Sequence, residues 1–325
     1  MSKMKLLKFF LCVVSWFSLA AGAARAEDIH VSAWGVVLVG APYAVALEKG
    51  YFKAADVTGV IATRGGGGTL VRNALAGGLP FVEAAPSAAI AGIDAGLPIK
   101  IVGLGTRSYA DSVWVMKKGA KPLTLQELPG KRVAITAPKS SFELQMLLLL
   151  QQAKVPSDRV TRVPVGALQS VLTAIDSGAV DIGPVVQPTW NSKRDNYQLA
   201  IRATDFLPAV PQTVLVAGTE LTDKQPQRLR AILAGRRQAV DFIYANPHEA
   251  AKLLEKYFKE VKPDDLRDAV DQLAKARYWS PGALEKEPLL RAVEGMRLTG
   301  ELDKAVDVMS MINTSFLPAD QQQMK

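Results

Sequence analysis

Short runs of β-branched and other apolar residues alternate with helical stretches from Ile29 onward. Strands are expected at residues 28–34, 57–64, 80–84 and 99–106, and helices at 41–50, 69–75 and 86–96. Pro42 lies near the start of the first of these helices and Gly50 ends it, and Pro86 opens the third in the same way. This alternation is typical of an α/β protein with a mainly parallel sheet.

The alternation starts again after residue 119, which indicates a second block of similar design. Strands are expected at 131–137, 160–165 and 180–186, helices at 140–153 and 166–178, and four more helices at 228–246, 247–260, 263–279 and 287–300. Two apolar segments, 112–118 and 213–219, flank this block and are predicted to be crossings between two lobes. The expected domains are a leader at 1–26, lobe one at 27–111, lobe two at 112–212, and a return to lobe one with the C-terminal helices at 213–325.

The N-terminus has the pattern of a secretory signal. Three lysines precede an apolar run from Phe9 to Ala21, and Ala24 and Ala26 stand where signal peptidase requires small residues. The run is shorter than the roughly 20 residues that cross a bilayer, which disfavours the alternative of a retained anchor. We expect cleavage after Ala26 and a soluble periplasmic protein.

Charge and cysteine content argue against nucleic-acid binding and against cysteine chemistry. The chain has 39 Lys and Arg residues against 31 Asp and Glu, a net charge of +8, and four of the basic residues lie in the leader. The others alternate with acids along the C-terminal helices, which favours solvated helix faces over a nucleic-acid site. Cys12, the only cysteine, is also in the leader, so the mature chain offers no disulfide, thiolate catalyst or cysteine-held metal.

Few residues offer catalytic chemistry. The two histidines, His30 and His248, belong to no G-x-S-x-G or H-E-x-x-H motif. Glu83 and Asp181 are the main acids near strand ends, and catalysis by paired carboxylates stays open from the residues alone. We expect a protein that is not an enzyme and holds no cofactor and no metal.

Four consecutive glycines, Gly65 to Gly68, precede the second predicted helix. No lysine follows them as in a phosphate-binding Walker loop, and the third glycine of a dinucleotide motif is missing. Glycines allow a sharp turn and a close approach of ligand to backbone, and a helix N-terminus attracts negative charge. The positive charge of Arg72, in the first turns of this helix, is repelled by the positive end of the helix dipole, and a bound anion would relieve this repulsion. A flexible surface turn is the alternative.

Helix N-termini that follow strands form the other candidate sites, since ligands of open α/β sheets bind at the carboxyl ends of the strands. Such points occur at Trp34 and Gly35, at Gly68 and Thr69, at Pro86 and Ser87, and at Ser140 and Ser141. Ser140 has the spacing of an N-cap with Glu143, so it has either a structural or a ligand role, and Ser141 is the better ligand donor. Trp34 either packs in the core or lines a pocket.

Several segments resemble a known family. WGVVLVGAPYAVALEKGYFKAADV, RGGGGTLVRNALAGG, APSAAIAGIDAGLPIKIVG, LQELPGKRVAITAPKSSFELQMLLLLQQAKV and SGAVDIGPVVQPTW occur in this order. Together they resemble the periplasmic substrate-binding proteins of ABC importers for aliphatic sulfonates, taurine and nitrate. The resemblance implies a two-lobed type II periplasmic binding protein, α/β in class, in which each lobe is a sheet flanked by helices and two crossover segments act as hinges.

The resemblance also implies a site and partners. Ligand contacts are expected at Trp34, Gly35, Gly68, Thr69, Ser87, Ser140, Ser141 and Gln187. The expected protein is a monomer that captures a small organic anion, such as a sulfonate or carboxylate, and delivers it to an ABC permease with its ATPase subunit. A sensor that presents its ligand to a membrane receptor is an alternative. An enzyme related to thiamine-pyrimidine synthesis is disfavoured, because those enzymes use cysteine-rich iron-binding segments.

Glu83 departs from this picture, because it brings a negative charge close to the expected cleft. A buried carboxylate would repel nitrate unless it is paired, and Arg64 and Arg107 are the predicted partners. Alternatively, Glu83 is a hinge residue or accepts backbone hydrogen bonds. A ligand with an amine or polar ring beside its acidic group would fit the charge better.

Overall fold

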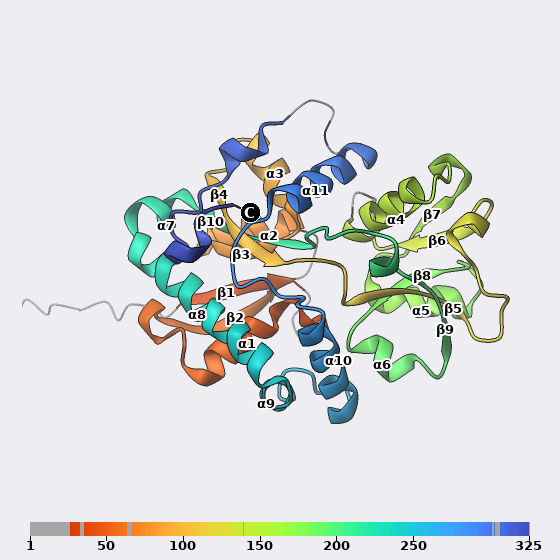
Figure 1. Cartoon of the computed structure of the whole chain (residues 1–325), viewed down its shortest axis with the longest axis horizontal. Coiled ribbons are helices and arrows are strands. Elements are labelled where there is room, and N and C mark those ends of the chain that lie inside the picture. The colour runs from red at the N-terminus through yellow and green to blue at the C-terminus, as the bar shows by residue number, and fades with distance from the viewer. Residues whose placement is uncertain are drawn as a thin grey trace, which may run out of the picture.

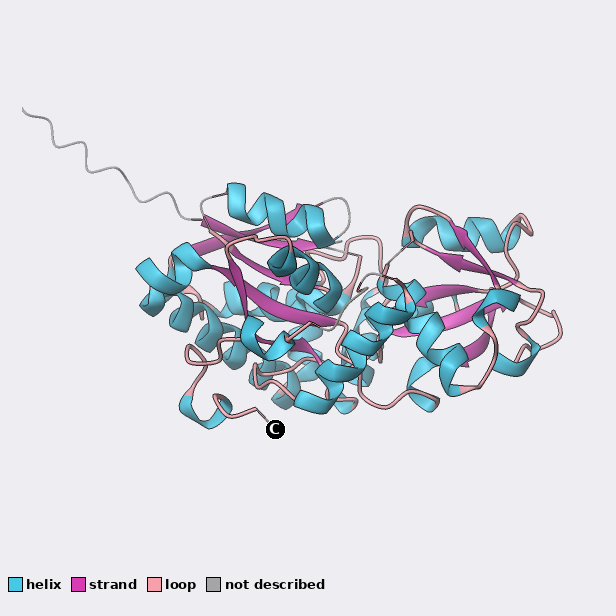
Figure 2. Ribbon diagram, turned by 90° about the horizontal axis from the view of Figure 1, so that it is seen from above, coloured by secondary structure: helices cyan, strands magenta, loops and turns pink. Residues whose placement is uncertain are grey.

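The alternating apolar pattern folds into two lobes, each built on β-sheets covered by helices (Figures 1 and 2). The computed structural model describes residues 27–32, 36–63, 67–77, 79–138, 140–300, 302 and 306–324. The predicted leader therefore lies outside the described residues. Within them, no helix combines the length and apolar character needed to cross a membrane.

The larger lobe contains a five-stranded sheet in the order β2-β1-β3-β10-β4. Its strands are β1 (Glu27–Ser32), β2 (Val57–Thr63), β3 (Phe81–Ala84), β4 (Ile99–Thr106) and β10 (Thr213–Gly218). β1 is parallel to β2 and β3, whereas β10 is antiparallel to both of its neighbours, β3 and β4. The expected parallel arrangement is thus broken at β10, because this strand enters the sheet from the other lobe and runs away from it.

Helices surround this sheet. They are α1 (Ala41–Lys49), α2 (Gly67–Ala76), α3 (Pro86–Asp94), α7 (Thr219–Lys224), α8 (Pro226–Ala245), α9 (Pro247–Leu254), α10 (Pro263–Lys275) and α11 (Lys286–Leu298). Gly50, with φ of 73°, ends α1 in the left-handed conformation that glycine adopts without strain. α1, α8 and α9 pack together over one large apolar core, which places the C-terminal helices on the larger lobe.

The smaller lobe carries the second block. In it, β5 (Ser112–Lys117) lies between β8 (Gly183–Val186) and β9 (Tyr197–Arg202) and is antiparallel to both, while β6 (Arg132–Ile135) pairs in parallel with β7 (Thr161–Pro164). A bridge between Val133 and Ile182 connects the two sheets. The helices are α4 (Ser141–Gln152), α5 (Leu168–Asp176) and α6 (Thr189–Lys193). The sequence pattern did not predict β9 or α6, because β9 is largely half-exposed and α6 is short.

The predicted crossing segments are wrong in position. Residues 112–117 and 213–218 form the strands β5 and β10, which are buried in the centres of their sheets. The connections between the sheets are residues 107–111 and 203–212, directly before each of these strands. Continuous apolar runs are favoured in buried strands, so the crossings fall on the more polar residues that precede them.

Candidate ligand-binding cleft

A cleft of about 780 Å³ has walls from both lobes. The larger lobe contributes residues of α2, β3 and α3, and the smaller lobe contributes residues 136–138, 140–142 and 166–169 around the starts of α4 and α5. Most of the lining side chains are apolar, and they include Val37, Leu70 and Phe142. The volume suits a small organic molecule.

The first turns of two helices from the smaller lobe and one from the larger lobe line this cleft. α3 follows Ala85 and α5 follows Ala167, and neither of these N-cap residues has a side chain that accepts a hydrogen bond from the helix. α4 starts at Ser141 on the same wall as α5. Helix N-termini carry partial positive charge and unpaired N–H groups, so these three ends favour an acidic group of a ligand.

Ser87, Ser140 and Ser141 line the cleft. Ser140 also has its predicted capping role, because its Oγ accepts a hydrogen bond from the backbone N–H of Glu143 at 3.3 Å. The reciprocal half of the capping box is absent from the described contacts, since the Glu143 carboxylate pairs with Arg162 Nε at 2.9 Å. At the start of α4 it is therefore Ser140, and not Ser141, whose hydroxyl is committed to capping. Contact of any of the three serines with ligand stays a prediction.

The glycine-rich segment is described only in part. Trp34, Gly35, Gly65 and Gly66 lie outside the described residues, and Gly68 is in the first turn of α2. Thr69 Oγ1 accepts a hydrogen bond from Arg72 Nη2 at 3.3 Å. Arg72 lines the cleft, whereas Gly68 and Thr69 are not among its described lining residues, so their role as ligand contacts also stays a prediction.

Gln187 has a different environment. Its Nε2 donates to Asn191 Oδ1 and to Gln272 Oε1 of α10, both at 2.9 Å, and it is not among the described residues that line the cleft. Ser192 Oγ donates to Asp265 Oδ2 at 3.0 Å close by. Gln187 therefore lies in a polar contact between α6 of the smaller lobe and α10 of the larger lobe.

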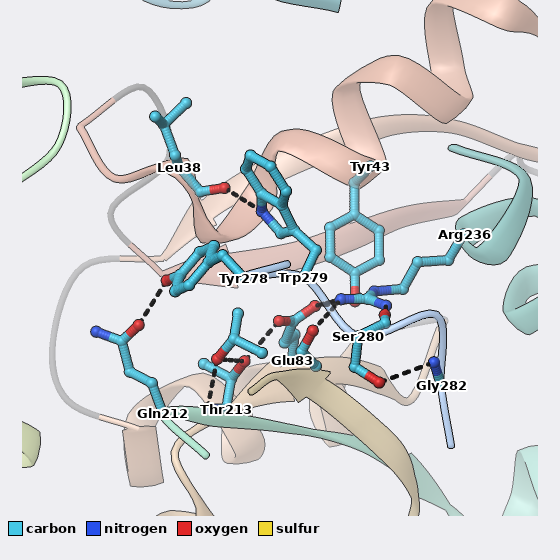
Figure 3. A network of polar contacts seen from close by, with 12 residues as sticks. Leu38, Tyr43, Glu83, Gln212, Thr213, Arg236, Tyr278, Trp279, Ser280 and Gly282 are labelled. Atoms are coloured by element: carbon cyan, nitrogen blue, oxygen red, sulfur yellow. Dashed lines mark hydrogen bonds and ion pairs between the residues drawn. The ribbon is translucent and has the colours of Figure 1, made fainter. Parts of the chain in front are cut away.

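Glu83 is 2% exposed and is held by four hydrogen-bond and ion-pair contacts (Figure 3). Arg236 of α8 approaches its Oε2 with Nη2 at 3.0 Å and Nε at 3.1 Å, and Tyr43 donates to the same oxygen at 2.7 Å. Thr213 Oγ1 donates to Oε1 at 2.6 Å. Arg107 was wrong as a predicted partner, because its Nε faces Glu285 Oε1 at 3.7 Å. Arg64, the other predicted partner, lies outside the described residues.

The Glu83 network ties several elements of the larger lobe together. Arg236 also donates to the carbonyl oxygens of Ser280 at 2.6 Å and Gly105 at 2.8 Å. Burial, and then the charge of Glu83, raise the pKa of Tyr43 well above its usual value, so the phenol stays protonated and donates. A Cβ at Gly105 would lie 2.3 Å from Glu83 Oε1, so only glycine allows this close approach.

Asp111 is the acid of the cleft that the sequence analysis missed. It lies at the end of the first connection between the lobes, is 1% exposed and lines the cleft. Within the described part of the chain, neither of its carboxylate oxygens has a hydrogen-bond partner. Burial raises its pKa to about 7. The polar groups of Tyr278 and Gln212 lie close enough to limit this rise, but they hydrogen-bond to each other and neither meets hydrogen-bond geometry with the carboxylate. The sequence signal that could have identified Asp111 is its position directly before the apolar segment that forms β5.

Residues 39–250 of the chain match the family described as NMT1/THI5 like. The protein belongs to the NMT1/THI5-like family. This match spans strands and helices of both lobes and includes all the described lining residues of the cleft from Val39 to Thr213.

Solved structures show which fold this NMT1/THI5-like protein has. The periplasmic aliphatic sulphonate binding protein SsuA of Escherichia coli superposes with a TM-score of 0.70 and 16% identity, over 88% of this chain and 96% of SsuA. The periplasmic nitrate-binding protein NrtA of Synechocystis PCC 6803 superposes with a TM-score of 0.73 and 15% identity, over 91% of this chain and 90% of NrtA. The desulfurization enzyme DszB superposes with a TM-score of 0.65 and 13% identity, over 89% of this chain and 97% of DszB. The fold is that of periplasmic binding proteins, and at these identities the likeness extends to the fold alone.

Proposed function

We propose that this protein is a solute-binding receptor that captures a small organic acid in the cleft between its lobes and delivers it to an ABC permease. The observation that carries this proposal is the cleft itself, with an apolar wall and the first turns of α3, α4 and α5 converging on it from both lobes. The periplasmic binding protein fold, shared with SsuA and NrtA, supports it.

In this proposal the protein is exported, loses residues 1–26 and acts as a periplasmic monomer without a cofactor. Ligand would favour approach of the two lobes, since it touches both walls of the cleft only when they are close. The two connections at 107–111 and 203–212 would bend during this closure. The closed form would then present a surface that the permease, and through it the ATPase subunit, recognises.

Two alternatives use the same fold. A sensor component would bind its ligand in the same cleft and present it to a membrane receptor, and DszB is an example of an enzyme with this fold. We propose binding without catalysis, because the acids of the cleft do not form a catalytic pair: Glu83 is saturated by Arg236, Tyr43 and Thr213, and Asp111 has no described partner.

The test is a thermal-unfolding screen of the mature chain with sulfonates, carboxylates and pyrimidines. A ligand at 100 times its dissociation constant adds about 2.7 kcal/mol of stability, which is easily measured as a shift of the melting temperature. We expect the bound compound to be recovered unchanged by mass spectrometry after prolonged incubation. Recovery of a converted product would establish an enzyme instead. Deletion of the gene distinguishes an importer from a sensor, because only the loss of an importer abolishes uptake of the ligand.

A further inference from the structure

Asp111 is an anomaly in the cleft wall. A carboxylate that is buried in a protein is normally paired or hydrogen-bonded, because removing it from water without compensation costs several kcal/mol. Asp111 is 1% exposed, and neither of its oxygens has a partner among the described residues. Asp111 is nevertheless one of the residues that line the cleft, and its carboxylate lies directly behind the cleft surface.

The polar groups around Asp111 are already engaged with one another. The Tyr278 hydroxyl donates to Gln212 Oε1 at 2.5 Å (Figure 3), and the Ser112 hydroxyl donates to the carbonyl of Tyr109 at 3.1 Å. Arg236, the buried cation of this region, donates to Glu83, Ser280 and Gly105. The fold therefore supplies Asp111 with no cation of its own in the described part of the chain.

The groups that favour an anion and the acid Asp111 come from different parts of the cleft wall. Arg72 is the one Lys or Arg side chain among the described lining residues, and it comes from α2 rather than from the connection that carries Asp111. The first turns of α3, α4 and α5 favour an anion, whereas Asp111 is a negatively charged hydrogen-bond acceptor above its pKa of about 7. The cleft thus offers sites for two groups of opposite character, with apolar side chains such as Val37, Val39 and Leu168 between the lobes.

We infer that Asp111 binds a positively charged nitrogen of the ligand, so that the solute is a small amino acid-like or N-heterocyclic organic acid rather than a simple sulfonate, carboxylate or nitrate. This inference rests on the proposed function and specifies the ligand class of the same cleft. The cation would provide the missing partner of Asp111, and the acidic group of the ligand would lie at the helix N-termini. Glu83 does not need an amine of the ligand, because Arg236 is its cation, whereas Asp111 is the acid that lacks one.

The experiment compares isosteric pairs of probes that differ only in a charged nitrogen. 4-Aminobutyrate is matched with pentanoate, and 4-(aminomethyl)benzoate with 4-ethylbenzoate, and dissociation constants are measured by calorimetry at pH 8. A hydrogen bond to a charged group is worth about 1.5–3 kcal/mol, so the amine of at least one pair should bind about 10- to 150-fold more tightly than its isostere.

Two variants assign this preference to the residue. Asp111→Asn keeps the shape of the side chain and should bring the ratio of the two affinities close to one. Asp181→Asn removes an acid that pairs with Arg132 on the smaller lobe and is not among the described cleft residues, and it should keep the ratio of the unaltered protein.

The outcomes separate this inference from the proposed function. Tight binding of the isosteres that lack the amine, with an affinity ratio that Asp111→Asn leaves unchanged, would retain the receptor and overturn the role of Asp111. Failure of every probe and of the whole screen of sulfonates, carboxylates and pyrimidines would overturn the receptor and this inference together. A ligand-free measurement also applies: an Asp111→Asn protein that is less stable than the unaltered one at pH 8 would show that Asp111 has an internal partner and would overturn the inference.

Discussion

Glu83 and Asp111 are two buried carboxylates on the wall of the same cleft, and they have opposite surroundings. Their exposures are 2% and 1%. Glu83 has Arg236, Tyr43 and Thr213 as partners, whereas Asp111 has none among the described residues. Burial alone therefore does not distinguish a structural acid from a functional one. A saturated carboxylate stabilises the framework, and an unsaturated one lowers stability and is available for a ligand.

The largest expected effect comes from breaking the Glu83 network. Arg236→Met leaves Glu83 as an uncompensated buried charge, which should lower the free energy of unfolding by about 3–5 kcal/mol. Urea unfolding followed by circular dichroism measures this change. The double variant Arg236→Met with Glu83→Leu is the control, and it should recover much of the loss because no charge is left unpaired. A single variant as stable as the unaltered protein would show that the ion pair does not hold the lobe together.

Asp111→Asn should have the opposite sign in the absence of ligand. The pKa of Asp111 rises from 3.8 to about 7 in the folded protein because burial disfavours the charged form. Below pH 3.8 the carboxyl is protonated in both the folded and the unfolded chain, and between pH 3.8 and about 7 only the unfolded chain ionises, so stability falls as pH rises. The full difference is at most about 4 kcal/mol.

Unfolding measured between pH 4 and pH 8 tests this sign. Asp111→Asn should be the more stable protein at pH 8, and the gap should close toward pH 4. The charged groups near Asp111 do not reverse the expectation, because Glu83 is paired with Arg236, and burial and then Asp111 raise the pKa of Tyr278 far above this range. Asp181→Asn is the matched control. Burial raises the pKa of Asp181, but Arg132 outweighs this and lowers it, so this control should not gain stability as the pH rises.

Gly105→Ala tests how tightly the Glu83 network is built. The added Cβ would lie 2.3 Å from Glu83 Oε1 and 2.4 Å from Thr213 Oγ1, so these side chains must shift. Overpacking of this kind costs about 1–3 kcal/mol in the free energy of unfolding. Gly92→Ala in α3 serves as control, because its nearest neighbours are the ends of the Ile99 and Leu97 side chains at 3.2 Å. Equal effects of the two substitutions would argue against a special constraint at Gly105.

The smallest effect is expected at the contact between α6 and α10. If Gln187 acts through Gln272, then Gln187→Ala and Gln272→Ala should change ligand affinity by the same small factor, about 2- to 12-fold, since each removes the same hydrogen bond. If Gln187 instead touches the ligand, as its motif predicts, Gln187→Ala alone should weaken binding. Calorimetry with one identified ligand, on both variants, distinguishes these two roles.

Local sequence determined the secondary structure and the class of fold. Apolar periodicity and the placement of Pro42, Gly50 and Pro86 depend on neighbours only a few residues away, and α1, α3 and the strands β1 to β4 lie where these signals indicated. The cap at Ser140 is equally local, because donor and acceptor are three residues apart. Ser87, Ser140 and Ser141 were selected by the same reasoning, and all three line the cleft.

Only the tertiary structure decided the partners of the charged and polar side chains. Glu83 and Arg236 are 153 residues apart in the chain, and Gln187 and Gln272 are 85 apart. No short-range pattern specifies such pairs, because they depend on how complete sheets and helices pack. The antiparallel entry of β10 and the lack of a partner for Asp111 have the same origin, since each depends on where the chain crosses between the lobes. The sequence thus determined which elements form the walls of the cleft, and long-range packing determined which of its acids is left for a ligand.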